Sequence, residues 1–361
     1  MNGMVYRAAA IGHTGAGGFG HGLHTCFGAN DNLELVAVSD PDGEGRIKAQ
    51  QESGALRSYN DHEQMLNAEE LDIVSVGPRW PERHVELVTA CLESGAHVYC
   101  EKPMTSNLVD GDFLVATAKK LGKKIAVAHQ GVYLPEARSV KEALAAGTIG
   151  DVQAVYAHGK QDGRGGGEDM MVLGTHLFNF MRFVLGDVQW MSGHVRVGGH
   201  EATPADVREA TEPIGPIAGD NVNSYFVFES GVSGYFESRV NAARDGMRMG
   251  MEIVGSAGTI ALRGGTPVGA LLYPHGTFYP GDESQRWVPL VGSEETSLAN
   301  GNELAIVDLI EAIENDRPPV SSAADAVAAL EMILGTYESH ITGRRVKIPL
   351  ANRNHPLVSW Q

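Results

Sequence analysis

The sequence has few cysteines and no long apolar run, and each shortage excludes a class of protein. Its three cysteines, Cys26, Cys91 and Cys100, form no CxxC pair, so we expect neither a disulfide framework nor a metal site. No window holds about 18 uninterrupted apolar residues, so we expect no membrane span. The first residues lack the charged and apolar regions of a secretory signal. These features predict a cytoplasmic protein without a membrane partner.

Basic residues are also scarce, because 28 Lys and Arg stand against 45 Asp and Glu and give a formal net charge of −17. Such a surface repels phosphate backbones, so nucleic acid is not an expected partner. Glycine, in contrast, is abundant, with 45 among 361 residues, well above the usual share of about 7%. The length corresponds to roughly two domains.

The order of the apolar patterns predicts two different domains. Five short apolar runs occur in the first 128 residues, and helical patterns separate the later ones, as in parallel βαβ units. From residue 129 onward, strand patterns follow one another across tight glycine turns, which is typical of an antiparallel sheet. The sequence therefore predicts an α/β Rossmann domain with a parallel sheet over residues 1–128. It predicts an α+β domain with a large, mostly antiparallel sheet over residues 129–361. The five runs are 5–11, 33–39, 73–76, 97–100 and 124–128.

A glycine-rich segment follows the first predicted strand. Gly15, Gly17 and Gly20 spell GxGxxG, the pattern in which a tight turn and the N-terminus of a following helix hold a pyrophosphate. Asp40 ends the second predicted strand, where a carboxylate accepts hydrogen bonds from a ribose and repels a 2′-phosphate. NAD is therefore expected as cofactor, and NADP is disfavoured. The other cofactor-binding candidates in the segment are Gly12, His13, Thr14 and Phe19.

A Glu-Lys-Pro tripeptide, Glu101-Lys102-Pro103, follows the fourth predicted strand. Ligands of open parallel sheets bind beyond the carboxyl ends of the strands. Lys102 is thus placed to donate a hydrogen bond to an alcohol or carbonyl oxygen and to relay a proton. Glu101 is expected to orient Lys102 or to hold the nicotinamide ribose. A surface ion pair is the alternative for these two residues.

With these motifs the chain resembles the Gfo/Idh/MocA oxidoreductases. The resemblance rests on GxGxxG, AVSDPD, GAHVYCEKP and IGDVQAV, followed by the antiparallel half, and it covers nearly the whole chain. It implies a Rossmann domain that binds a nicotinamide cofactor and a second domain with a large sheet. It further implies hydride transfer to or from a sugar, inositol or related polyol, with Lys102 as the catalytic lysine. The residues after the third strand, among them Gly77, Pro78 and His84, are expected to contact the cofactor.

The family also has a helix with an Asp-x-x-x-His pair, which corresponds here to residues 172–176. His176 is present and suits proton transfer because an imidazole titrates near neutral pH, but Val172 stands at the aspartate position. If the helix is regular, Asp169 and Asn179 share the face of His176 and become candidates for binding substrate. A core histidine on an apolar helix is the alternative. The remaining substrate candidates follow the fifth predicted strand and are His129 and Tyr133.

We therefore expect an NAD(H)-dependent oxidoreductase that acts on a cyclic sugar, glycoside or polyol, in which Lys102 and His176 handle the alcohol proton. Val172 weakens an assignment to inositol dehydrogenase, and C3 of a pyranoside is the favoured position of oxidation. Three alternatives stay open: an NAD-retaining glycoside hydrolase or lyase that uses transient oxidation, a sugar-nucleotide enzyme, and a non-catalytic sensor. An exposed sheet face in the second domain would favour a homodimer or homotetramer.

Overall fold

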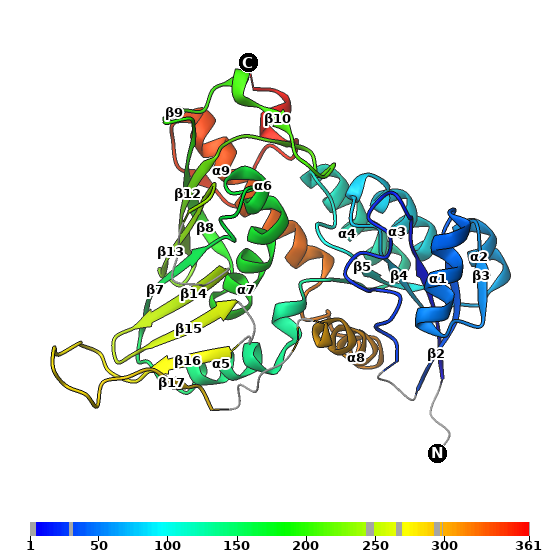
Figure 1. Ribbon diagram of the computed structural model, residues 1–361, viewed down its shortest axis with the longest axis horizontal. Coiled ribbons are helices and arrows are strands. Elements are labelled where there is room, and N and C mark those ends of the chain that lie inside the picture. Colours follow the sequence, from blue (N-terminus) through cyan, green and yellow to red (C-terminus); the bar gives the residue numbers. More distant parts are fainter. Residues whose placement is uncertain are drawn as a thin grey trace. The chain divides into compact units, whose positions relative to one another are not determined.

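The computed structural model describes residues 5–28, 32–242, 249–264, 269–291, 297 and 299–360. Its contacts divide the chain into two compact units (Figure 1). The sequence predicted one boundary, after residue 128, whereas the first unit also includes two later segments. The order of patterns along the chain does not predict that later segments join the first unit. Unit 1 comprises Met1–Tyr133, Glu212–Ile214 and Ala299–Val327, and unit 2 comprises Leu134–Thr211, Gly215–Leu298 and Ala328–Gln361.

Unit 1 contains a six-stranded, wholly parallel sheet with the strand order β3-β2-β1-β4-β5-β6. This is the doubly wound Rossmann order, and it confirms the predicted fold class. The order changes direction between β1 and β4, so the ligand-binding edge of such a sheet lies at the carboxyl ends of these strands. The strands are β1 (Tyr6–Ile11), β2 (Leu33–Ser39), β3 (Arg57–Tyr59), β4 (Ile73–Val76), β5 (His97–Cys100) and β6 (Ile125–Val127).

Helices alternate with most of these strands, and local signals in the sequence explain their ends. The longest of the crossover helices, α4 (Leu108–Leu121), begins where the side chain of Asn107 accepts a hydrogen bond from the Asp110 amide. It ends at Gly122, which has a φ of 65°, a conformation that glycine adopts without strain. The other helices of unit 1 are α1 (Gly43–Ser53), α2 (His62–Ala68), α3 (His84–Glu93) and α8 (Asn300–Glu314), with 3-10 turns at Pro81–Arg83 and Gln130–Tyr133.

Unit 2 is built on a ten-stranded sheet with the order β17-β16-β15-β14-β7-β13-β12-β8-β18, and β9 pairs with β8. Among the described strands of this sheet, only β7 and β13 pair in parallel. The predicted large, mostly antiparallel sheet is therefore confirmed. Its strands are β7 (Val152–His158), β8 (Val188–Val197), β9 (His200–Glu201), β12 (Asn221–Phe228), β13 (Ser233–Arg239), β14 (Met249–Gly255), β15 (Thr259–Gly264), β16 (Gly269–Tyr273), β17 (Val288–Pro289) and β18 (Val346–Lys347).

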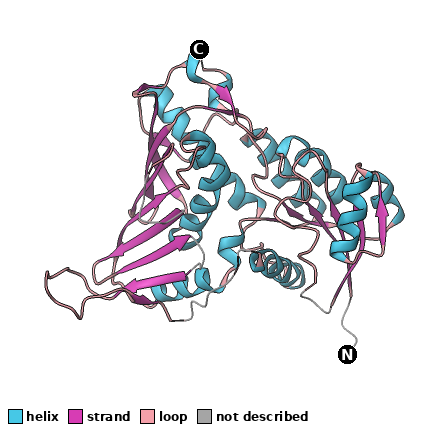
Figure 2. Ribbon diagram, viewed as in Figure 1, coloured by secondary structure: helices cyan, strands magenta, loops and turns pink. Residues whose placement is uncertain are grey.

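The two faces of this sheet differ because successive side chains of a strand point to opposite faces. On one face, Phe226 and Phe236 pack edge-on against Phe178 of α7 (Thr175–Leu185), and Figure 2 shows the helices of unit 2 along this face. On the other face, Tyr235 stacks on Tyr156 with ring centroids 4.8 Å apart, and both rings are exposed. The sheet thus has one covered face and one face that carries exposed aromatic rings.

The remaining elements of unit 2 are short, apart from one long helix. A separate two-stranded sheet joins β10 and β11. In the described residues, no helix combines the length and the apolar character that crossing a membrane requires. The elements are α5 (Pro135–Ala145), α6 (Gly167–Asp169), the π-helix η3 (Met170–Gly174), β10 (Arg208–Glu209), β11 (Pro216–Ile217) and 3-10 turns at Pro204–Asp206 and Pro356–Val358. The long helix α9 (Ala323–Thr342) begins in unit 1 and continues in unit 2.

Candidate functional site

The glycine-rich segment after β1 forms consecutive turns. Between β1 and β2 the structure describes residues 12–28 and residue 32, and residues 12–28 contain no α-helix. The predicted helix after GxGxxG is therefore wrong over this stretch. The reason lies in the backbone, because five glycines here adopt positive φ angles and a right-handed helix requires negative ones. These glycines are Gly15, Gly17, Gly18, Gly20 and Gly22, with φ between 59° and 91°.

Within residues 12–22, three backbone amides face no acceptor in the described part of the chain, namely those of Gly15, Gly17 and Phe19. Neighbouring amides are engaged within the loop, as when His13 and Gly18 exchange hydrogen bonds. A run of open N–H groups forms a concave site for an anion. These donors fit a pyrophosphate even though the segment lacks a helix dipole.

Two glycines of the segment are required by close packing. A Cβ atom at Gly17 would lie 2.7 Å from the backbone nitrogen of Arg79. At Gly20 it would lie 2.3 Å from Oε2 of Glu101 and 2.5 Å from the carbonyl oxygen of Gly77. The glycine segment therefore sits directly against the carboxyl ends of β4 and β5, which is where the sequence places the cofactor-binding residues.

Asp40 at the end of β2 is fully buried, and its carboxylate holds the glycine segment. It accepts hydrogen bonds from the Thr14 amide at 2.9 Å, from the Thr14 hydroxyl at 2.9 Å and from the Asp42 amide at 2.9 Å. Nη1 of Arg46 donates to the Asp40 carbonyl oxygen at 2.7 Å. The carboxylate that the sequence assigns to a ribose is thus already engaged by donors of the chain itself.

His84 lies beneath the loops that follow β4 and β5 and is completely buried. Its Nε2 is 2.7 Å from the Pro78 carbonyl oxygen, and its Nδ1 is 3.0 Å from the Met104 carbonyl oxygen. Burial lowers the pKa of His84, and a neutral imidazole donates from only one nitrogen. The ring therefore lies between the two loops and donates a hydrogen bond to one of these two carbonyl oxygens. The amide of Gly77 donates to the Ile11 carbonyl oxygen, which joins the same edge to β1.

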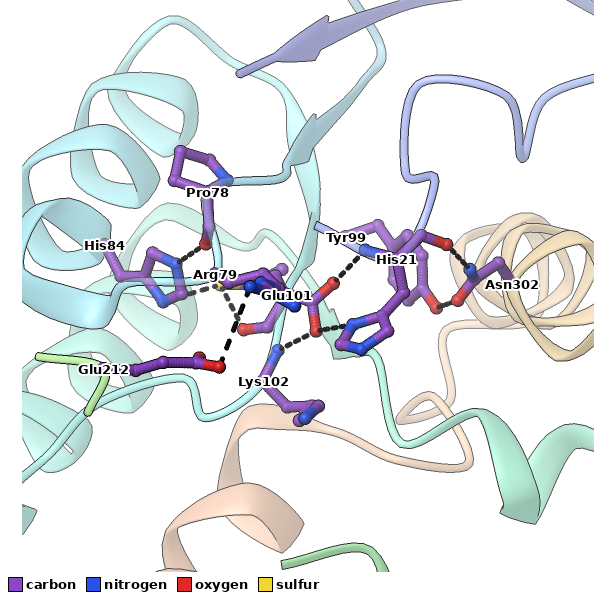
Figure 3. A network of polar contacts seen from close by, with 10 residues as sticks. His21, Pro78, Arg79, His84, Tyr99, Glu101, Lys102, Glu212 and Asn302 are labelled. Carbon is purple, nitrogen blue, oxygen red and sulfur yellow. Dashed lines mark hydrogen bonds and ion pairs between the residues drawn. The ribbon is translucent and has the colours of Figure 1, made fainter. Parts of the chain in front are cut away.

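Glu101 links the glycine segment to Lys102 (Figure 3). Its carboxylate is fully buried; Oε2 accepts from the His21 amide, and Oε1 lies 3.0 Å from both Nδ1 of His21 and the Lys102 amide. Burial alone would raise the pKa of Glu101, but the contacts with His21 and Lys102 lower it below its ordinary value. An ionised carboxylate therefore fixes the backbone of Lys102, whose side chain is itself largely buried.

Two further residues of this network were not found from the sequence. The Tyr99 hydroxyl donates to Oδ1 of Asn302 at 2.7 Å, and Nδ2 of Asn302 donates to the His21 carbonyl oxygen at 2.9 Å. Asn302 lies in α8, about 280 residues from the segment it holds. No periodicity or motif in the sequence predicts such a contact. Arg79 also belongs to this region and pairs with Glu212 at 3.7 Å.

In unit 2, the helix that carries His176 is not regular. The π-helix η3 separates Asp169 from His176 and uses i→i+5 hydrogen bonds, one residue more than the α-helical pattern. This turns Asp169 by about 100° relative to an uninterrupted α-helix. The predicted common face of Asp169 and His176 is therefore wrong. His176 and Asn179 both lie in α7 and still share a face.

Asp169 and Asn179, which the sequence placed on the face of His176, have different surroundings. The Asp169 carboxylate is buried and accepts from the Ser238 hydroxyl at 2.6 Å and the Gln161 amide at 3.2 Å. Burial raises the pKa of Asp169. Asn179 is also buried, and its Oδ1 has no hydrogen-bond partner in the described residues. His176 itself is half-buried.

His129 and Tyr133 meet at one residue of unit 1. Nδ1 of His129 lies 3.0 Å from the Ser321 hydroxyl, and the Tyr133 hydroxyl lies 3.3 Å from both the amide and the carbonyl oxygen of Ser321. Both side chains are buried. They fasten the end of β6 to the segment before α9. No group of three His, Cys, Asp or Glu side chains suited to a metal occurs among the described residues.

A pair of glycine substitutions tests whether the segment binds the dinucleotide. Gly18 and Gly20 have nearly equal φ angles, 59° and 60°, but a Cβ atom at Gly18 meets nothing within 4 Å. Both Gly18→Ala and Gly20→Ala add left-handed strain, and only Gly20→Ala also displaces Glu101. We expect Gly20→Ala to weaken NAD binding at least about tenfold more than Gly18→Ala, measured by calorimetric titration. Equal affinities would contradict the placement of the site at Gly20.

Two family models match the chain, one in each of its two predicted domains. The one described as "Oxidoreductase family, NAD-binding Rossmann fold" matches residues 10–129, and the "GFO/IDH/MocA C-terminal domain" matches residues 137–261. Among curated relatives, D-apiose dehydrogenase of Paraburkholderia graminis is 26% identical over 91% of this chain and 87% of its own length. D-glucoside 3-dehydrogenase of Escherichia coli is 29% identical over 52% of this chain and 56% of its own length.

Solved structures agree on the fold. A levoglucosan dehydrogenase in complex with NADH and levoglucosan has a TM-score of 0.75 at 17% identity, covering 95% of this chain and 99% of that one. The parallel sheet, the glycine segment with its open amides, and both family matches lead to one conclusion. The chain belongs to the Gfo/Idh/MocA family and is an NAD-dependent oxidoreductase.

Proposed function

We propose that this enzyme oxidises a secondary hydroxyl of a cyclic sugar, glycoside or polyol, with C3 of a pyranoside as the favoured position. The observation that carries the proposal is Lys102, an amine at the carboxyl edge of the sheet, held beside the glycine segment by the buried Glu101. Relatives named D-apiose dehydrogenase and D-glucoside 3-dehydrogenase support a carbohydrate substrate, and the second supports C3.

Oxidation of an alcohol removes a hydride from its carbon and a proton from its oxygen. Bound NAD supplies the acceptor for the hydride. In the proposal, Lys102 donates a hydrogen bond to the alcohol oxygen and stabilises the negative charge that develops there. Neutral His176 accepts the hydroxyl proton. The alcohol thereby becomes a ketone, its hydride would pass to bound NAD, and His176 returns its proton to water.

The remaining predicted substrate residues contribute unequally to this proposal. Asn179 shares a face with His176 and has an Oδ1 atom without a hydrogen-bond partner in the described residues. We therefore assign to it the orientation of His176 or a substrate hydroxyl. Asp169, His129 and Tyr133 already contact groups of the chain, so their part is to shape the site from behind.

Cofactor preference follows from the charges near the end of β2. The Asp40 carboxylate contacts Thr14 and Asp42, so a direct bond to the ribose is not its main task. Two neighbouring carboxylates, those of Asp40 and Asp42, still repel a 2′-phosphate. The proposal therefore keeps NAD ahead of NADP, although the Arg46 guanidinium contacts the Asp40 carbonyl oxygen at this corner.

The proposal extends to assembly and location. The exposed Tyr156 and Tyr235 rings on the open face of the large sheet support a homodimer or homotetramer. The three cysteines are free and buried, which suits a reducing cytoplasm.

A substrate panel tests the function directly. We expect purified protein with NAD and a set of sugars, glycosides and inositols to produce reduced nicotinamide together with a product two hydrogens lighter, monitored by absorbance and mass spectrometry. Consumption of a glycoside without net NADH would instead assign redox-assisted cleavage. If no compound is consumed while NAD still binds, the dehydrogenase proposal fails and a sensor is favoured.

Substitutions test the two proton-handling residues. We expect Lys102→Ala and His176→Ala each to lower kcat by about 10²–10⁴-fold while NAD binding stays near its original strength. Lys48→Ala serves as the control, because this lysine is exposed and, in the part of the chain that the structure describes, pairs only with Glu52. Full turnover by either site variant would remove that residue from the mechanism.

The assembly is tested by sedimentation of the full chain. We expect a dimer or tetramer, and Tyr235→Glu should shift the equilibrium toward the monomer because it places a charge on the open sheet face. Phe278→Glu is the control, since Phe278 is exposed but lies outside the sheet. A monomeric wild-type protein at micromolar concentration would overturn this part of the proposal.

A further inference from the structure

His21 is a half-exposed imidazole whose position is fixed from three directions. Its amide donates to Oε2 of Glu101 at 3.0 Å, and its Nδ1 lies 3.0 Å from Oε1 of the same carboxylate. Its carbonyl oxygen accepts from Nδ2 of Asn302 at 2.9 Å, and Tyr99 in turn holds Asn302. Figure 3 shows these contacts converging on one residue. Exposed side chains are seldom held in this way, because fixing them costs conformational entropy.

The partner of the imidazole determines where its proton lies. Glu101 is completely buried and ionised, and a carboxylate only accepts hydrogen bonds. The contact at 3.0 Å therefore requires a hydrogen on Nδ1 of His21. In the neutral ring, Nε2 is then the unprotonated nitrogen and carries a lone pair. The same logic orients the histidine of catalytic triads through a carboxylate.

Nε2 is the one hydrogen-bonding group of His21 that has no partner in the described residues. The side chain is 43% exposed, so this nitrogen is accessible. Oε1 of Glu101 contacts both Nδ1 of His21 and the amide of Lys102, and Figure 3 shows the imidazole and the Lys102 side chain on the same side of that carboxylate. His21 also directly follows Gly20 of the glycine segment.

We propose that His21 is a further ligand-binding residue of this enzyme, in which Glu101 and Asn302 fix the imidazole so that Nε2 accepts a hydrogen bond from a hydroxyl group of the bound ligand. The hydroxyl belongs either to a ribose of the cofactor or to the sugar substrate, and the second source rests on the proposed function. Glu101 thereby positions two groups at once, the imidazole through its ring and Lys102 through its backbone.

An ordinary surface ion pair is the competing explanation, and the chain offers a matched example. His194 is 48% exposed and lies 2.7 Å from Oε1 of Glu201, but that glutamate is itself 65% exposed. Such pairs contribute little to stability. The His21 pair differs because its carboxylate is completely buried and its own backbone is held on both sides.

The first test reads the tautomer and needs no turnover. Nitrogen NMR of histidine-labelled protein, above the pH at which the ring protonates, should show Nδ1 of His21 protonated and Nε2 unprotonated. Glu101→Gln should weaken this preference, because the amide has one accepting oxygen for the three groups that the two carboxylate oxygens face. His21→Ala identifies the resonance. A His21 ring protonated on Nε2 in the wild-type protein would overturn the proposal.

The second test separates acceptance at Nε2 from the hold on Glu101. His21→Asn keeps an N–H donor near the position of Nδ1 but has no acceptor at the position of Nε2. If the hydroxyl is a ribose, this variant should bind NAD about fivefold more weakly, the equivalent of one hydrogen bond. If it belongs to the substrate, KM should rise by about the same factor with NAD affinity unchanged.

A His–Glu pair outside this network provides the control. His194→Asn removes an equally exposed imidazole from a His–Glu pair outside this network and should leave NAD affinity and KM unchanged. His21→Asn with wild-type NAD affinity and wild-type KM would overturn the proposal. If the wild-type protein oxidises no sugar, the proposed function fails, whereas the tautomer and NAD-binding measurements still decide the role of His21.

Discussion

The buried carboxylate of Glu101 is the interaction on which the candidate site depends. It accepts hydrogen bonds from the backbone of His21 and from the backbone of Lys102, and it lies directly beneath Gly20. Burying an ionised carboxylate is costly unless its oxygens are satisfied, so this group defines where its donors lie. The glycine segment and the lysine are consequently positioned against one another, although 80 residues separate His21 from Glu101.

The net charge of −17 imposes a second constraint, because the cofactor is also an anion. Long-range electrostatic attraction therefore cannot steer such a ligand to the protein. The segment also lacks the helix whose dipole usually compensates, as five glycines with positive φ prevent a right-handed helix. What remains are the open amides of Gly15, Gly17 and Phe19. Binding must therefore rest on short-range hydrogen bonds, which explains why so many glycines gather in one turn-rich segment.

The sequence predicted those parts of the fold that follow from local pattern. The five apolar runs became β1, β2, β4, β5 and β6, and the change from helix-separated to consecutive strands marked the change from a parallel to an antiparallel sheet. Lys102 was found because a motif places it at a strand end. The strand β3 was missed because none of its three residues is buried and they show no apolar run. Asn302 was missed because its contact with His21 spans 281 positions and follows from tertiary packing alone.

The failed expectations share a physical cause, which is that backbone geometry overrode the standard repeat. A π-helix between Asp169 and His176 shifts the face that a period of 3.6 residues predicts. The expectation that Asp40 contacts the ribose stays a prediction, but residue type alone does not say which donors of the chain reach a carboxylate first. Thr14 and Asp42 reach it from within the chain. Glu101 likewise accepts hydrogen bonds from groups of the chain itself. In this site the buried carboxylates therefore position backbone amides and an imidazole. The groups that they position, Lys102 and Nε2 of His21, are the ones available to contact a ligand.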